Sequence, residues 1–80
     1  MLPTIDQCKK TVTGSLRYER KEHGYTQNAL ADAIKRDSST VNGWEGNGGS
    51  ISLADAWRVA DVYGISLDQL AGRPRPSQTA

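Results

Sequence analysis

Two short apolar patterns, separated by a break of three residues, constrain the fold of this 80-residue chain most strongly. Within each pattern the apolar residues recur at spacings of three and four, which places them on one face of a helix. The first pattern contains Leu30, Ala31 and Ile34, and the second contains Val41 and Trp44. Residues 35–37 interrupt the rhythm, and Asp37 is a favourable N-cap for a second helix. The segment 26–46 therefore predicts two short helices joined by a tight turn.

The outward face of the second helix has an unusual composition. Its residues are short, uncharged and able to form hydrogen bonds, whereas a helix face that serves only solubility usually carries Glu and Lys. Short donors and acceptors suit contact with base edges in the major groove of DNA. We take Ser38, Ser39 and Asn42 as base-reading candidates and Thr40 as a candidate for phosphate or a thymine methyl group. The alternative is a solvated face without a partner.

Together these residues resemble the helix-turn-helix of the phage repressor and Cro family, also called XRE-like. The resemblance extends from about Leu16 to Leu70. It is carried by Gln27, Ala31, Val41, Trp44, Glu45 and the segment SLADAWRVADVYGISLDQL at residues 52–70. It implies an all-α fold, a compact five-helix lambda-repressor-like DNA-binding domain.

The turn between the two helices departs from the family pattern at two positions. Lys35 stands where the family usually has glycine, and Arg36 stands where it usually has an apolar residue. A positive φ costs a residue other than glycine about 1 kcal/mol or slightly more. Either Lys35 tolerates that conformation or the turn differs locally, and we expect Arg36 to be more exposed than its family counterpart.

The resemblance also implies roles for three polar residues. Gln27 opens the first helix of the motif, where free amides and the helix dipole favour a phosphate. In the family this glutamine contacts the DNA backbone and can brace the recognition helix. Arg20 and Glu45 match positions that pair between the first helix of the domain and the end of the recognition helix.

The distribution of charge is more informative than the net charge of +1. Residues 1–36 hold seven Lys and Arg against four acidic residues, whereas residues 37–72 hold one Arg against five acidic residues. This asymmetry suggests one face for an anionic partner, although chance in a small sample is the alternative. The candidate phosphate contacts, each with a plain surface role as its alternative, are Arg17, Lys21, Arg36 and Asn47.

Capping signals predict three further helices. Thr4 with Gln7 matches a capping box for a long first helix, whose apolar residues are Ile5, Cys8, Val12 and Leu16 and which ends near His23 and Gly24. A fourth helix is capped by Ser52 and ended by Gly64, with a predicted buried stripe of Leu53, Ala56, Val59, Ala60 and Tyr63. Ser66 with Gln69 matches another capping box, for a short fifth helix. We expect one domain at residues 1–72 and a disordered tail at 73–80.

Other classes of protein find little support in the sequence. The single cysteine, Cys8, cannot form an internal disulfide and lacks partners for a metal site. There is no apolar run that predicts a membrane span or signal peptide, and no nucleophile–base pair or phosphate-cradling motif. We therefore expect a cytoplasmic protein that is not an enzyme, has no cofactor or metal and takes no small-molecule ligand.

The leading interpretation is a sequence-specific transcriptional regulator, a Cro-like repressor that acts by occupying its operator. Its partners are double-stranded DNA with a pseudo-palindromic operator and a second copy of the chain, at least on DNA. The predicted dimer interface consists of Leu67, Leu70 and Trp57, although burial of Trp57 against the first helix is an equal alternative. Two other functions stay open, namely the antitoxin of a toxin–antitoxin pair and a helix-turn-helix fold used only for protein contact.

Overall fold

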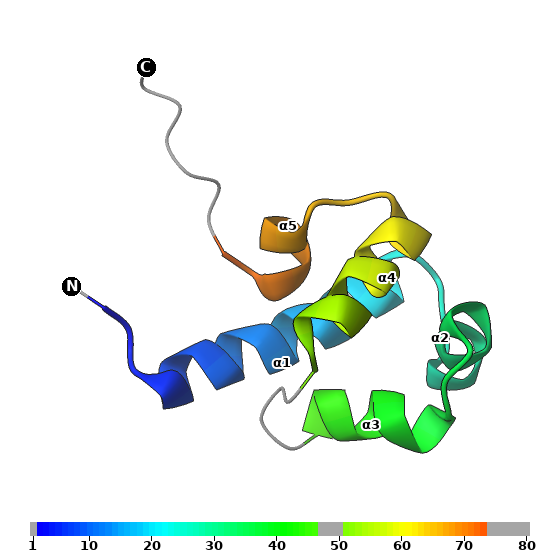
Figure 1. Cartoon of the computed structure of the whole chain (residues 1–80), viewed down its shortest axis with the longest axis horizontal. Helices are drawn as coiled ribbons and strands as arrows, with labels where there is room; N and C mark the ends of the chain where they lie inside the picture. The colour runs from blue at the N-terminus through cyan, green and yellow to red at the C-terminus, as the bar shows by residue number, and fades with distance from the viewer. Residues whose placement is uncertain (1, 47–50, 74–80) are drawn as a thin grey trace.

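The computed structural model describes residues 2–46 and 51–73, and within these ranges the regular structure is entirely helical. The helices are α1 (Ile5–Glu22), α2 (Gln27–Ile34), α3 (Ser38–Gly46), α4 (Leu53–Tyr63) and α5 (Leu67–Ala71). In Figure 1 the long α1 runs across the middle of the view, and its N-terminal half projects away from the other helices. The predicted all-α, lambda-repressor-like fold is confirmed.

Side-chain hydroxyls begin four of the helices. At α1 the predicted capping box is present, because Thr4 Oγ1 accepts from the Gln7 amide at 3.1 Å and Gln7 Oε1 accepts from the Thr4 amide at 2.8 Å. Thr26, Ser52 and Ser66 cap α2, α4 and α5, and in each the side-chain oxygen accepts from the backbone amide three residues later. The box predicted at α5 is only half formed, since the Gln69 side chain donates to Glu19 Oε1 at 3.4 Å instead.

Four helices are followed by a left-handed residue, which is the C-cap of α2, α4 and α5 and comes one residue after the C-cap His23 of α1. Three of these residues are glycines, and the fourth is Lys35, with φ 58° and ψ 49°. The amide of Arg36 donates to the Ala31 carbonyl at 2.9 Å, and the amide of Lys35 donates to the Asp32 carbonyl at 3.3 Å, the paired bonds of a Schellman motif. Lys35 therefore adopts the conformation for which glycine is usually chosen.

The core lies where α1, α2, α3 and α4 meet, and α5 closes it against α1 and α4. Val41 is fully buried and Trp44 is 6% exposed, as their spacing predicts. Pairing of α2 with α3 holds the two motif helices together. The buried apolar residues are Leu16, Leu30, Ala31, Ile34, Val41, Trp44, Val59, Ala60, Tyr63 and Leu70.

Leu53 of the predicted buried stripe is in fact exposed, and so are two of the apolar residues at helical spacing in α1. Ile5 is 70% exposed and Leu53 is 74% exposed, and Cys8 is exposed as well. Ile5 and Cys8 lie on the N-terminal half of α1, which projects away from the other helices of the described residues (Figure 1). Their helical spacing identified a common face correctly, but a face is buried only where another element packs on it.

The tail predicted at residues 73–80 falls at the end of the described ranges. Arg73 is described and follows α5, whereas residues 74–80 of the predicted tail lie outside the described residues. Among the helices of the described ranges, none has the length and apolar character needed to cross a membrane.

Candidate DNA interface

Helix α3 separates its side chains sharply between two faces. Val41, Trp44 and Glu45 are buried against the rest of the domain. The three base-reading candidates Ser38, Ser39 and Asn42 are exposed, and Thr40 is half-buried. Because α3 begins at Ser38, the first two of these candidates lie at the helix start, next to the turn. The exposed face of α3 thus presents neutral hydrogen-bonding groups on short stems.

A chain of hydrogen bonds runs from this face into the domain through Gln27. Asn42 Nδ2 donates to Gln27 Oε1 at 3.2 Å. Gln27 Nε2 in turn donates to Glu45 Oε1 at 3.3 Å. Gln27, at the start of α2, therefore contacts one exposed and one buried side chain of α3.

The network ends in the ion pair of Arg20 and Glu45. Arg20 Nε lies 2.7 Å from Glu45 Oε2, and Arg20 Nη2 lies 3.0 Å from Glu45 Oε1, so the pair is bidentate. Arg20 Nη1 also donates to the Tyr25 carbonyl at 2.8 Å. Glu45 is 3% exposed, and its hydrogen bonds with the guanidinium raise the pKa of Arg20. These contacts connect α1, the segment after it and α3 at one buried point.

The predicted phosphate contacts have different surroundings. Arg17 is exposed and donates to the Glu45 carbonyl at 3.4 Å, while Lys21 is exposed on the following turn of α1. Arg36 is exposed, as expected, and its Nη2 lies 3.5 Å from Asp55 Oδ2. The remaining candidate, Asn47, lies outside the described residues.

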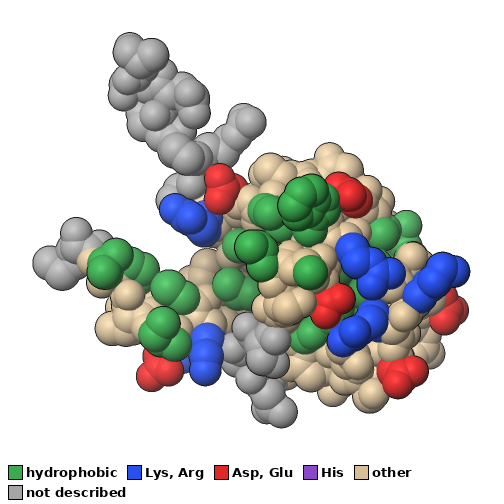
Figure 2. All heavy atoms as spheres, viewed as in Figure 1, with side chains coloured by type: hydrophobic (Ala, Val, Ile, Leu, Met, Phe, Trp, Pro, Cys, Tyr) green, Lys and Arg blue, Asp and Glu red, His purple; other side chains and the backbone are tan. Residues whose placement is uncertain are grey.

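Arg58 and Asp55 form a contact near the turn that the sequence analysis did not anticipate. Arg58 donates to the Ile34 carbonyl at the end of α2, and its Nη1 lies 3.9 Å from Asp55 Oδ1. Figure 2 shows basic side chains gathered where α4 adjoins α2, with an acidic one among them. The spacing of Asp55 and Arg58 on one helix was a visible signal, but the contact with Ile34 depends on tertiary packing.

The residues of the predicted dimer interface are not equally accessible. Trp57 is 61% exposed, so it lies on the surface and is not buried against α1. Leu67 is half-buried. Leu70 is 1% exposed and belongs to the core of the single domain. The accessible part of this surface therefore consists of Trp57 and the outer side of Leu67.

In residues 2–46 and 51–73, no group of three His, Cys, Asp or Glu side chains is arranged to hold a metal ion.

A family model described as helix-turn-helix matches residues 16–70. The chain belongs to the XRE-like helix-turn-helix family. This family consists of DNA-binding regulators, so the chain is a DNA-binding regulator of the XRE type. Comparisons with curated proteins and with solved structures found no match.

Proposed function

We propose that this XRE-type regulator is a Cro-like repressor that reads a specific operator and acts by occupying it. The observation that carries the proposal is the division of α3 into a buried face and a neutral, hydrogen-bonding exposed face. A helix of this kind fits the major groove, where donors and acceptors distinguish the base pairs. Occupancy alone blocks access to a promoter, so this function needs no catalytic group and no cofactor.

Asn42 is the main base-reading residue in this proposal, with Ser38 and Ser39 beside it. An Asn side chain can form two hydrogen bonds with an adenine edge, whereas Ser is less selective. Asn42 is exposed and keeps its carbonyl oxygen free of the bond with Gln27, which uses its amide nitrogen. Gln27 orients Asn42 from the side of α2 and offers a further contact to phosphate.

The backbone of the DNA is contacted in this proposal by groups around α3. Arg17 and Lys21 are exposed on α1, and Thr40 lies at the margin of the exposed face of α3. Arg36 reaches phosphate by exchanging its exposed contact with Asp55 for the stronger negative charge of DNA. Asn47 is proposed on sequence grounds alone.

One recognition helix contacts only a few base pairs, so we propose that two copies bind a pseudo-palindromic operator. The half-sites would then lie about 10 bp apart, or one helical turn. Exposed Trp57 and half-buried Leu67 are proposed as part of the contact between copies. Leu70 supports that surface from within the core.

The experiment that tests this function begins with selection of bound duplexes from a random pool. We expect Asn42→Ala to weaken binding to the selected operator by about 1–3 kcal/mol and to relax the choice of one base pair. As a matched comparison, Lys21→Ala should weaken specific and random duplexes equally and lower the salt slope by about 1.

Three other outcomes would contradict the proposal. Equal losses for Asn42→Ala on selected and random DNA would exclude a reading role for that residue. A single copy that saturates the operator, regardless of half-site spacing, would contradict the dimer. Failure to bind any duplex at low salt would leave the fold as a protein-contact module.

A further inference from the structure

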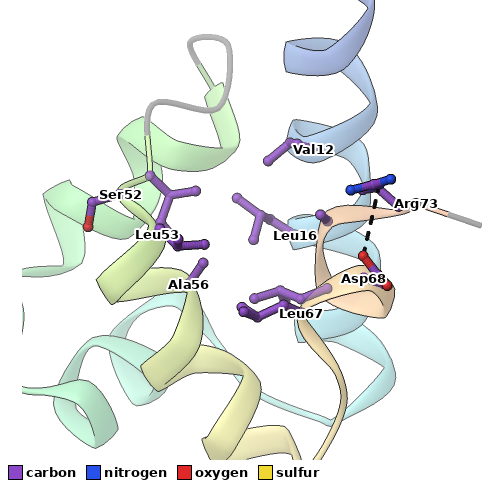
Figure 3. Close-up of a pocket in the computed structure, with 11 residues that line it drawn as sticks. Val12, Leu16, Ser52, Leu53, Ala56, Leu67, Asp68 and Arg73 are labelled. Carbon is purple, nitrogen blue, oxygen red and sulfur yellow. Dashed lines mark ion pairs between the residues drawn. The ribbon is translucent and has the colours of Figure 1, made fainter. Parts of the chain in front are cut away.

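An open groove on the side formed by α1, α4 and α5 is lined mainly by apolar side chains. One hollow of about 450 Å³ lies between the three helices, and a second, larger hollow of about 580 Å³ adjoins it along α1. The two share Val12, Ala71 and Arg73 and so form one continuous groove. Figure 3 shows Leu53 and Ala56 of α4 facing Val12 and Leu16 of α1 across this space, with Leu67 at its end. We call it the α1–α4–α5 groove.

A ridge of matching apolar character borders the groove, and its first residue, Leu2, also lines the second hollow. It consists of Leu2, which is 91% exposed, and Ile5, which is 70% exposed, on the projecting N-terminal part of the chain. Residues 2–15 precede the segment that the family model matches, so the helix-turn-helix fold does not account for these apolar side chains. Figure 2 shows hydrophobic side chains along this projecting end and also over α4 and α5.

We propose that the groove binds the N-terminal half of α1 from a second copy of this chain. This inference rests on the proposed dimeric function and names the surface that joins the two copies. A two-fold interface needs a surface that is complementary to itself. Here one molecule carries both parts, the apolar ridge and the apolar groove, so each copy inserts its ridge into the groove of the other. The proposed interface also continues through Leu67 toward Trp57, because Leu67 lines both the groove and the hollow beside Trp57.

Charge complementarity supports a second copy as the occupant. The charged side chains on the groove wall are Asp68 and Arg73, and the N-terminal half of α1 carries Asp6, Lys9 and Lys10. Lys9 follows Ile5 by one helical turn and shares its face, and Asp68 lies on the groove wall. Among the described residues, Asp68 forms its one ion pair with exposed Arg73, at 3.9 Å. Lys9 of one copy, beside the ridge, thus approaches Asp68 of the other.

Residues 74–80 of the same chain are a poorer occupant on grounds of composition. Their sequence, PRPSQTA, contains no large apolar side chain that would match a groove lined by Val, Leu and Ile. A second copy supplies Leu2 and Ile5, which do match it.

Sedimentation equilibrium, on the free protein and on operator DNA, tests the proposed surface. We expect Ile5→Asp and Leu53→Asp each to weaken association of the two copies by at least about tenfold, because each puts a charge into an apolar contact. Tyr18→Asp is the matched control, since Tyr18 is 60% exposed on α1 and does not line the groove. It should leave association unchanged. Circular dichroism should show intact helices in all three variants, because all three side chains are exposed.

Alkylation of Cys8 gives a second measurement that needs no change in the ridge. Cys8 is the only cysteine of the chain, is exposed, and lines the groove beside Leu2. Its reaction with a maleimide should slow several-fold as the protein concentration passes the dissociation constant of the dimer. In the control protein, Cys8→Ser with Tyr18→Cys, the rate should not depend on concentration.

The results separate this inference from the proposed function. Dimers that form equally well in Ile5→Asp and Leu53→Asp, with Cys8 unprotected, would overturn the groove as the interface and leave the dimeric repressor intact. Protein that stays monomeric both free and on DNA would overturn the second copy as occupant. Binding of each variant to a duplex with one half-site reports sequence reading alone, and we expect it to match that of the unchanged protein.

Discussion

The helix-turn-helix and the N-terminal half of α1 share the same kind of sequence pattern but differ in their environment. In α2 and α3 the apolar residues at helical spacing, such as Ile34 and Val41, are almost completely buried. In the first turns of α1, Ile5 has the same spacing to Val12 and Leu16 yet is 70% exposed. The difference teaches that periodicity predicts a helix and its apolar face, whereas burial depends on a neighbour that the pattern does not reveal.

The largest effect that would test this contrast is the truncation of Trp44. We expect Trp44→Ala to lower the free energy of unfolding by about 3–5 kcal/mol, because a large side chain is lost from the core. In a domain of this size such a loss approaches the whole stability. The matched change Ile5→Ala should cost less than about 0.5 kcal/mol in dilute, monomeric protein. Urea denaturation followed by circular dichroism measures both, and similar losses for the two variants would contradict the contrast.

A buried and an exposed ion pair extend the comparison to charged residues. We expect Glu45→Ala to destabilise the fold by about 3 kcal/mol, because it leaves the Arg20 guanidinium without its bidentate partner. Arg36→Ala removes the exposed contact with Asp55 and should cost less than about 1 kcal/mol. Thermal unfolding of the two variants tests whether Glu45→Ala lowers the melting temperature more than Arg36→Ala does. Equal effects would mean that the pair of Arg20 and Glu45 is solvated in solution.

The sequence predicted local features better than contacts between distant segments. The capping box of Thr4 and Gln7 and the helix ends at Gly24 and Gly64 follow from neighbouring residues, and the structure contains them. The burial of Val41 and Trp44 was also predictable, because the two helices of the motif must pack on each other. Leu53 was wrongly predicted to be buried, because the spacing of apolar residues in α4 does not reveal how that helix lies against the rest of the domain.

In the candidate DNA interface, too, local features could be predicted from the sequence better than contacts between distant segments. The exposed face of α3 followed from periodicity, and the pairing of Arg20 with Glu45 followed from the family resemblance. The bond of Arg58 with the Ile34 carbonyl joins positions that are 24 residues apart and involves a backbone group. Such a bond has no signature in side-chain types, so it could not be predicted.

A smaller effect is expected at the turn, where Lys35 has φ 58°. Lys35→Gly should raise the free energy of unfolding by up to about 1 kcal/mol, because glycine adopts the left-handed conformation without the clash of a Cβ atom. Some of the gain is offset by the greater freedom of glycine in the unfolded chain. The control is Gly64→Ala, at φ 69°, which should destabilise the domain. Destabilisation by Lys35→Gly would contradict a left-handed Lys35 in solution.

An effect of similar size is expected in α1, at a position whose requirement is the reverse of that at Lys35. Gly14 is within the helix, and a Cβ atom placed on it would meet nothing within 4 Å apart from its chain neighbours and the backbone of its own helix. Gly14→Ala should therefore stabilise the domain by about 0.5–1 kcal/mol, because alanine loses less backbone entropy than glycine when the helix forms. Urea denaturation of the single variants and of the double variant with Lys35→Gly measures the gain. The two positions belong to different regions and share no contact, so their effects should add within about 0.5 kcal/mol. A gain well below this range would indicate that the first half of α1 frays in solution and that the projecting region contributes little to the cooperative unfolding of the domain.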